Sequence, residues 1–272
     1  MKIAIQEDML SGKTLLQKFH HAKELGVDGI EFWGKGLTPK VPDIVGAIAK
    51  TGIVAASVNH GRQSRFLDPD PAERERALAE LRASMCDAVD IGAKGVIFVP
   101  HFFGPLLPDL MPFKTPVQLE AGLLVALIKT FMADFSHAMG VELYVEPVNR
   151  YETHFLNRLE QAAEIRRKAG SPEHVKIVAD LFHMALDEAD IAQAIRDNAE
   201  HIGHVHLADS NRRLPGQGTT DFAAAASALN AIGYDGWAAY ECGDPGDNAP
   251  RARQYRAQLP ESVAHVRAAG FA

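Results

Sequence analysis

Four short apolar segments in the second half of the chain each run straight into an ionisable side chain. Residues 141–145 precede Glu146, 175–179 precede Asp180, 202–205 precede His206, and 237–240 precede Glu241. These events recur at intervals of roughly 30 residues, about the length of one strand–helix unit. Because the carboxyl ends of parallel strands meet at one edge of a sheet or barrel, we expect the four side chains to converge.

The rest of the chain has the same alternation of apolar strands and amphipathic helices. Further strands are expected at 2–5, 27–32, 53–58 and 95–99, and helices at 13–25, 41–51, 72–91, 117–139, 159–169, 187–198, 222–232 and 251–268. Eight such units in 272 residues predict an α/β fold, a single (β/α)8 TIM barrel forming one domain over residues 1–272. An open doubly wound sheet is disfavoured, because no G-x-G-x-x-G turn follows the first strand.

Composition and charge exclude several functional classes. The net charge of −7 argues against a general affinity for nucleic acid. Cys86 and Cys242 provide no disulfide framework and no zinc spacing, which favours a reducing cytoplasm. The amino-terminal segment turns polar after five residues and the longest apolar run, 123–128, is too short to cross a bilayer, so we expect neither export nor membrane insertion.

Three carboxylates and one imidazole form an oxygen-rich donor set, which suits Mn²⁺, with Mg²⁺ or Co²⁺ as alternatives. Each residue alone would be explained as the cap of the next helix, but four in register predict a shared metal site. A divalent ion that chelates a sugar carbonyl and the adjacent hydroxyl acidifies the C–H bond between them and stabilises the enediolate. If Glu146 and Glu241 flank that carbon, one removes the proton and the other returns one, which inverts the carbon.

At this point the motifs resemble those of a known family. The strings EPVNRYE (146–152), DLFH (180–183) and HLADSNRRLPGQG (206–218), together with Glu241, are similar to those of the ketose 3-epimerases, the tagatose and allulose epimerase group within the xylose-isomerase-like TIM barrels. The motifs span the carboxyl-terminal half of the chain. The first half resembles the superfamily only in its strand–helix rhythm.

The resemblance implies a role for each matching residue. Glu146 and Glu241 would be metal ligands and also the acid/base pair, and Asp180 and His206 would complete the metal site. The substrate would be hydrogen-bonded near its carbonyl by Glu152, His183 and Arg212. A homo-oligomer that acts on a small sugar is also implied, while the identity of the sugar is not.

Other residues at early strand ends are candidates for the pocket wall. Trp33, Phe102 and Phe103 would stack on the apolar face of a sugar or else pack in the core. Glu31, His60 and His101 would line the pocket or else be satisfied locally, and none is given a catalytic role. The loop 243–251 has two aspartates and no evident anion nest, which favours an unphosphorylated sugar.

Several alternative functions remain open. Within the same superfamily these are hydroxypyruvate or aldose–ketose isomerases, sugar-phosphate epimerases and inosose dehydratases, and beyond them a metal-binding barrel without turnover. A DNA repair enzyme of the endonuclease IV type would use extra histidines near His60 and His101. It would also need an Asp-x-His pair where this chain has Ser210, Asn211 and Arg212, and the acidic net charge disfavours it.

Overall fold

A closed barrel of eight parallel strands forms the centre of the molecule, as seen in the computed structural model, which describes residues 1–61, 65–243 and 250–271. Each strand pairs with the next, and β8 closes onto β1. The prediction of a (β/α)8 TIM barrel is confirmed. The strands are β1 (Lys2–Gln6), β2 (Gly29–Trp33), β3 (Val54–Asn59), β4 (Gly95–Phe98), β5 (Glu142–Val145), β6 (Val175–Asp180), β7 (Ile202–Leu207) and β8 (Trp237–Tyr240).

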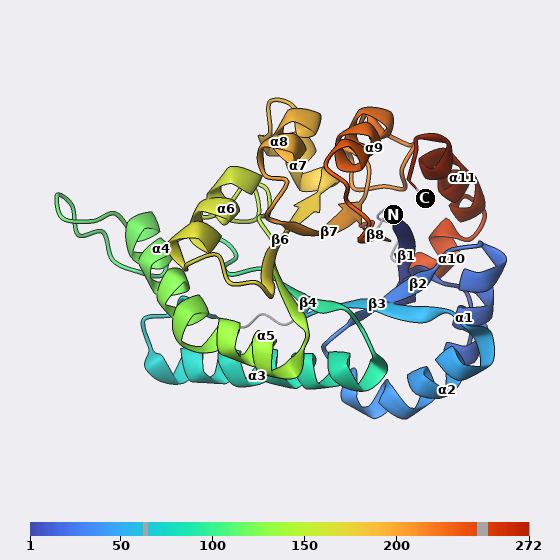
Figure 1. Ribbon diagram of the computed structural model, residues 1–272, viewed down its shortest axis with the longest axis horizontal. Coiled ribbons are helices and arrows are strands. Elements are labelled where there is room, and N and C mark those ends of the chain that lie inside the picture. The colour runs from blue at the N-terminus through green and yellow to red at the C-terminus, as the bar shows by residue number, and fades with distance from the viewer. Residues whose placement is uncertain (62–64, 244–249, 272) are drawn as a thin grey trace.

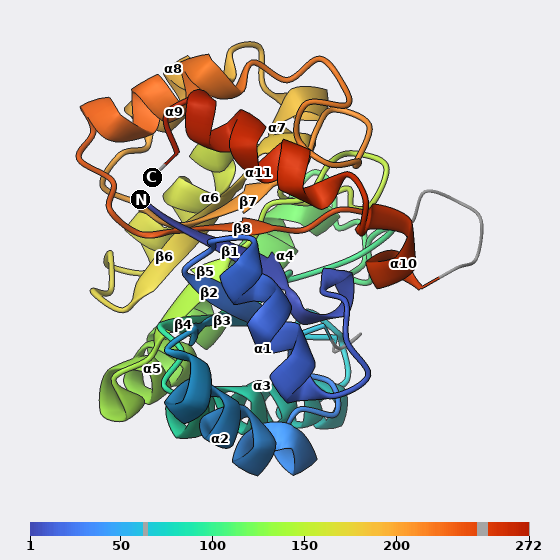
Figure 2. The ribbon, with the colours of Figure 1, turned by 90° about the vertical axis from the view of Figure 1, so that its right-hand side faces the viewer.

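Helices surround this barrel on its outside (Figure 1). In the side view, α8, α9 and α11 lie on one side of the strands, and α1, α2 and α3 lie on the opposite side (Figure 2). Short 3₁₀ turns, η1 (Glu7–Met9) and η2 (Thr38–Lys40), follow β1 and β2. The helices are α1 (Leu15–Glu24), α2 (Val41–Thr51), α3 (Pro71–Ile91), α4 (Pro116–Leu127), α5 (Ala133–Met139), α6 (Leu159–Lys168), α7 (Leu181–Asp187), α8 (Ile191–Asp197), α9 (Phe222–Ala231), α10 (Arg251–Tyr255) and α11 (Leu259–Ala268).

The helix predicted at 117–139 is interrupted by a π-helical turn, Ile128–Met132, between α4 and α5. The hydroxyl of Thr130 donates to the carbonyl of Ala126 at 2.8 Å, a bond back along the helix that competes with the regular ladder. By length and composition alone, the stretch Pro116–Met139 would be long and apolar enough to span a bilayer. It lies instead in the helical layer of the barrel, where its parts pack against α3 and α6.

The segment that follows β6 contains one helix more than the sequence predicted. The helix expected at 187–198 is present as α8, but α7 precedes it and begins directly at Leu181 because Asp180 caps it, accepting from the backbone N–H groups of Phe182 and His183. A second helix, α8, begins after Asp190, which caps it in the same way. The helix expected at 251–268 is likewise two helices, α10 and α11, and a proline stands in the first turn of α11.

Packed side chains fill the barrel interior below the carboxyl ends of the strands. Tyr144 lies between Gly95 and Gly203, and a Cβ atom on either glycine would come within 2.7 Å of its ring. Trp237 occupies the interior beside a group of small residues, Ala4, Ala56 and Ala239. In the part of the chain that the structure describes, side chains fill the barrel below its carboxyl-terminal mouth, and a cavity opens at the mouth itself.

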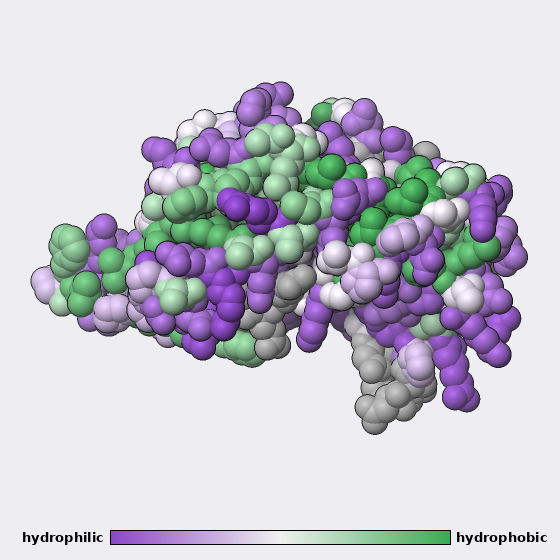
Figure 3. All heavy atoms as spheres, turned by 90° about the horizontal axis from the view of Figure 1, so that it is seen from below, coloured by the Kyte–Doolittle hydropathy of each residue, from purple (hydrophilic) through white to green (hydrophobic). Residues whose placement is uncertain are grey.

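The loop between β4 and α4 projects away from the barrel (Figure 1). Its tip carries exposed apolar side chains, Leu110, Met111 and Phe113. Apolar atoms are visible at the projecting end of the molecule in the space-filling view (Figure 3). The first residues of this loop, by contrast, turn back over the barrel mouth, where they line a cavity.

Candidate metal centre and active site

The four strand-end residues predicted to converge do so at the mouth of the barrel. Asp180 and His206 are paired in register on β6 and β7, while Glu146 and Glu241 directly follow β5 and β8. One ligand atom from each side chain lies within 4.8 Å of the others, and all four residues are buried. Nδ1 of His206 is 2.9 Å from Glu146, 3.3 Å from Glu241 and 3.7 Å from Asp180.

The charge balance of this centre fits a divalent cation. Burial raises the pKa of the Glu146 carboxyl to about 7, and although His206 opposes this, Glu241 and Asp180 repel the ionised form further. Buried carboxylates of this kind are stable as a cluster only when cations compensate them. Three oxygen donors and one imidazole are a donor set that suits Mn²⁺ or Mg²⁺.

Arg212 supplies part of the compensating charge. Its Nη1 donates to Asp180 at 2.6 Å and its Nη2 donates to Glu241 at 2.5 Å, so the guanidinium bridges two of the carboxylates. Burial opposes ionisation of Asp180, but Arg212 and His183 hold its pKa well below the usual range. The guanidinium lies over the ring of Phe182, with its central carbon 4.6 Å from the ring centroid.

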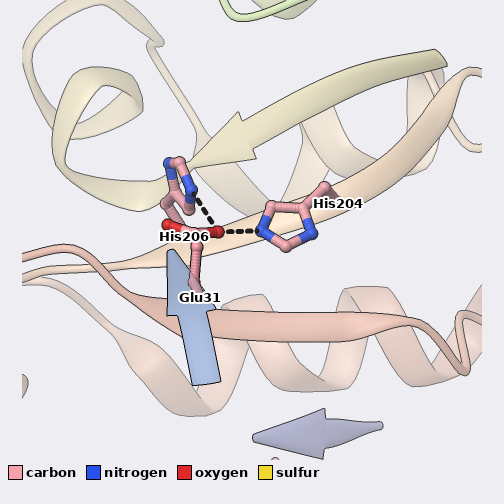
Figure 4. A group of neighbouring side chains, drawn as sticks. All are labelled: Glu31, His204 and His206. Atoms are coloured by element: carbon pink, nitrogen blue, oxygen red, sulfur yellow. Dashed lines mark hydrogen bonds and ion pairs between the residues drawn. The ribbon is translucent and has the colours of Figure 1, made fainter. Parts of the chain in front are cut away.

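Glu31 on β2 orients the histidine of this centre from beneath. Figure 4 shows its carboxylate between His204 and His206, both on β7, with one oxygen 3.0 Å from Nε2 of His204 and 3.3 Å from Nε2 of His206. Burial disfavours the ionised form, yet the two histidines hold the pKa of Glu31 well below its usual range. Because Nε2 of His206 faces Glu31, Nδ1 is left to face the other three carboxylates.

Glu241 is held in place by neutral donors from the first half of the chain. Asn59 donates to its Oε1 at 2.7 Å and Gln6 donates to the same oxygen at 3.1 Å. Gln6 also donates to Glu31 at 3.0 Å, and its own amide oxygen accepts from Arg251 at 3.1 Å. Arg251 therefore fixes the amide so that its NH₂ group points at both carboxylates.

The three side chains predicted to bind substrate all lie beside the centre. Nδ1 of His183 accepts from the backbone N–H of Asn149 at 3.1 Å, and burial lowers the pKa of His183 to about 4, so its neutral ring carries the proton on Nε2. Glu152 accepts from the side chain of Asn149 at 2.9 Å and keeps 43% of its side chain exposed. Nε2 of His183 lies 3.5 Å from Asp180, and Arg212 donates to the same carboxylate, so the binding candidates and the proposed metal ligands are in direct contact.

A cavity of about 730 Å³ opens above this centre. Its walls contain Glu146, Glu241 and the three predicted substrate contacts, so the structure brings acid/base and binding candidates into one space. The structure places Glu31 below the cavity, fully buried and outside its wall, so of the two alternatives for this residue, local hydrogen bonding rather than lining the pocket is the one observed. The expected wall residues that do line it are Trp33, His60, His101, Phe102 and Phe103.

Sequence reasoning missed the residues that orient the centre. Gln6, Ser57 and Asn59 were not proposed as site residues, yet Gln6 and Asn59 hold Glu241, and Ser57 donates to Glu31 at 2.7 Å. The available signal was their position, because Gln6 and Asn59 are polar residues at the ends of otherwise apolar strands. Residues 244–249, on which the expectation of an unphosphorylated sugar depends, lie outside the part of the chain that the structure describes.

Known proteins resemble this chain over nearly its whole length. A 3-dehydro-D-guloside 4-epimerase of Escherichia coli is 33% identical over 89% of this chain and 92% of its own. A ketose 3-epimerase of Arthrobacter globiformis is 37% identical over 80% of this chain and 74% of its own. The crystal structure of the apo form of a 3-keto-D-glucoside 4-epimerase from E. coli superposes with a TM-score of 0.85, at 29% identity, over 98% of this chain and 99% of that one.

These relatives are carbohydrate epimerases, which confirms the prediction of an enzyme of the isomerase class that acts as a sugar epimerase. Their names differ in the carbon that is epimerised, which is C4 in two of them and C3 in the ketose 3-epimerase. The model of the xylose isomerase-like TIM barrel family matches residues 19–265. The chain belongs to the xylose isomerase-like TIM barrel family.

Proposed function

We propose that this enzyme inverts the hydroxyl-bearing carbon next to the ketone of a keto sugar, with a 3-keto-glycoside as substrate and C4 as the inverted carbon. The observation that carries the proposal is the arrangement of Glu146 and Glu241. Both carboxylates lie within 3.3 Å of the same nitrogen of His206, come from β5 and β8, and face one cavity. Two carboxylates around one reacting carbon are what proton removal and return require.

The two glutamates would exchange roles between the forward and reverse reactions. Glu241 is fixed by Asn59, Gln6 and Arg212, and Glu146 is held by His206. Each carboxylate would remove the proton from one face of the sugar, and the opposite one would deliver a proton to the other face. A divalent cation held by Glu146, Asp180, His206 and Glu241, for which we propose Mn²⁺, would polarise the ketone and stabilise negative charge on its oxygen.

The three other polar groups would hold the reacting part of the sugar. Arg212 and the Nε2–H of His183 would donate to substrate oxygens, and Glu152 would accept from a hydroxyl. Arg212 also carries positive charge at the place where negative charge develops during proton removal. These contacts would act on the ketone and its neighbouring hydroxyls, which free ketoses and keto-glycosides share.

Two observations favour a glycoside over a free monosaccharide. The cavity of about 730 Å³ exceeds the volume of one hexose, and Phe103 and Tyr151 extend its wall with exposed aromatic rings. Apolar faces of a second sugar or another aglycone would stack on such rings. The 92% coverage of the 3-dehydro-D-guloside 4-epimerase at 33% identity supports the same choice.

A deuterium exchange experiment tests this proposal. The Mn²⁺-loaded protein is incubated in D₂O with a methyl 3-keto-glucoside and, separately, with fructose, tagatose and ribulose, and the label is located by NMR. Label at C4 together with the C4 epimer is the expected result. No exchange on any of these sugars would overturn the assignment of proton transfer to Glu146 and Glu241.

Epimerisation of free ketoses at C3 is the second candidate. It is favoured by the 37% identity to the ketose 3-epimerase of A. globiformis and by the motifs around Glu146 and His206. In the same experiment it would give label at C3 of a free ketose, with no change in the keto-glucoside. Label at C1 would instead indicate an aldose–ketose isomerase.

A further inference from the structure

A second group of potential ligands lies apart from the centre already described, and one of its members, His101, lines the cavity. His101 follows β4, Glu120 lies in α4, and His154 lies in the loop after β5. One ligand atom from each of these side chains lies within 4.8 Å of the other two. Glu120 is fully buried, while 21% of the His154 side chain remains exposed, so the group is accessible to an ion from one side.

Backbone carbonyls determine which ring nitrogens of the two histidines carry protons. Nε2 of His101 is 2.7 Å from the carbonyl of Gly104, and Nδ1 of His154 is 2.9 Å from the carbonyl of Phe103. A carbonyl only accepts, so both of these nitrogens must donate. In neutral rings this leaves a lone pair on Nδ1 of His101 and on Nε2 of His154. A histidine that binds a metal typically donates its other N–H to a carbonyl in this way.

The contact between Nε2 of His154 and the carboxylate of Glu120 requires a positive charge between the two groups. Nε2 of His154 lies 2.6 Å from Oε2 of Glu120, and the second oxygen of Glu120 accepts from the backbone N–H of Leu106 at 3.2 Å. A lone pair and a carboxylate oxygen at this distance repel unless a positive charge is shared between them, either a proton or a metal ion. An ion with bonds of ~2.1 Å separates its ligand atoms by roughly 3.4 Å, so its entry would open this contact by less than about 1 Å.

We propose that His101, Glu120 and His154 form a second metal site, selective for a nitrogen-preferring ion of the Zn²⁺ type. Two imidazoles and one carboxylate are a recognised set of three protein ligands for zinc, with a fourth position left for water. The centre at the barrel mouth has three carboxylates and one imidazole and suits harder ions. The chain would therefore hold two different ions. This inference does not depend on the proposed function, because none of its three ligands belongs to the proposed catalytic group.

An ion at this position would join two loops that carry part of the cavity wall. Phe103 donates its N–H to the carbonyl of Glu152 at 2.6 Å, and His154 donates its N–H to the carbonyl of Phe103 at 3.1 Å. Phe103 has a positive φ of 67° and is 75% exposed. The metal site would fix the loop after β4 to the loop after β5. It would thereby also fix the positions of Phe103 and Glu152, which line the cavity.

Metal counting tests the proposal directly. Purified protein is stripped with chelator, loaded with excess Zn²⁺, desalted and analysed for zinc per chain, with folding checked by circular dichroism. Wild type is expected to retain two zinc ions, and His101→Gln and His154→Gln to retain one. His137→Gln is the matched control, since His137 is an exposed histidine on α5 beside His174, and it should retain two.

A second measurement separates metal binding at this site from metal binding at the centre in the barrel mouth. In a variant that combines Asp180→Asn with His206→Gln, Co²⁺ should still bind and give the visible absorption of a four-coordinate site, and adding His154→Gln should remove that absorption. Retention of one zinc ion by the wild type would overturn the proposal, as would unchanged zinc content in His101→Gln or the absence of cobalt absorption. The three side chains would then be joined by a proton alone.

Discussion

The two halves of the barrel contribute different chemistry to the same mouth. Strands β5 to β8 end in three carboxylates and one histidine that face one another, and two of the carboxylates, Glu146 and Glu241, also line the cavity. Strands β1 to β3 supply side chains that hydrogen-bond those groups, although Trp33 and Asn59 also line the cavity. Gln6 and Asn59 donate to Glu241, and Glu31 accepts from His206.

This difference separates the groups that would meet a ligand from the groups that hold them. The second half concentrates negative charge, which is unfavourable in a buried place without a cation. The first half supplies hydrogen bonds that make one orientation of each ligand preferable to others. From this division we expect substitutions in the second half to abolish activity, and substitutions in the first half to weaken metal binding or slow turnover.

Removing the metal should have the largest effect. Treatment with chelator is expected to abolish epimerisation, and Mn²⁺ should restore it, because all four proposed ligands lie in one cluster. Bound metal should also increase the free energy of unfolding by about 2.7 kcal/mol at an ion concentration 100-fold above Kd, and should therefore raise the midpoint temperature of unfolding. Activity is measured by NMR and unfolding by calorimetry. Full activity in protein shown to be free of metal would contradict the proposed mechanism.

Replacement of either glutamate should come next. Glu146→Gln and Glu241→Gln are each expected to lower kcat by roughly 10²–10⁴-fold, since each removes one partner of the proton transfer. In each variant, the intact glutamate should still exchange the substrate proton on its own face of the sugar, so the rate of exchange should fall less than the rate of epimerisation. The two rates are compared in D₂O with metal content checked in parallel. Equal loss of exchange from both epimers in metal-loaded protein would contradict the assignment of one face to each glutamate.

Glu31→Gln tests the contribution of the first half of the barrel, where Glu31 orients His206. The amide loses the charge that orients Nε2 of His206, so metal affinity is expected to fall about 10- to 100-fold, while kcat at saturating metal falls much less. Titration with Mn²⁺ followed by activity separates the two effects. Ser57→Ala, which removes a single bond to Glu31, is the milder control. Loss of activity that excess metal does not restore would place Glu31 among the catalytic groups instead.

Asn59→Ala should have the smallest effect. It removes the 2.7 Å bond to Glu241 but leaves Gln6 and Arg212 in place, so we expect kcat to fall about tenfold, the value of one hydrogen bond to a charged group. Metal affinity should change less than in Glu31→Gln. Steady-state kinetics at saturating metal provide the measurement, and a loss as large as that of Glu241→Gln would erase the distinction between the two halves.

Much of the proposed site was predictable because the strand–helix rhythm is local. Apolar runs that end in Glu146, Asp180, His206 and Glu241 identify strands from their own residues, and parallel strands in a closed barrel bring their carboxyl ends together. Errors arose where one side chain changed the local course of the chain. Asp180 caps a helix that begins at once, and the long helix from Pro116 contains a π-helical turn.

Local sequence patterns were sufficient to predict the order of the eight strands and the ionisable residues at the ends of β5 to β8. Only the folded structure shows that Glu31 supports His206 from below, that Gln6 holds Glu241, and that His101, Glu120 and His154 lie close together. The physical reason is that hydrophobic periodicity depends on neighbours a few residues apart. Hydrogen bonds between side chains 235 residues apart, such as those of Gln6 and Glu241, exist only after the barrel has closed.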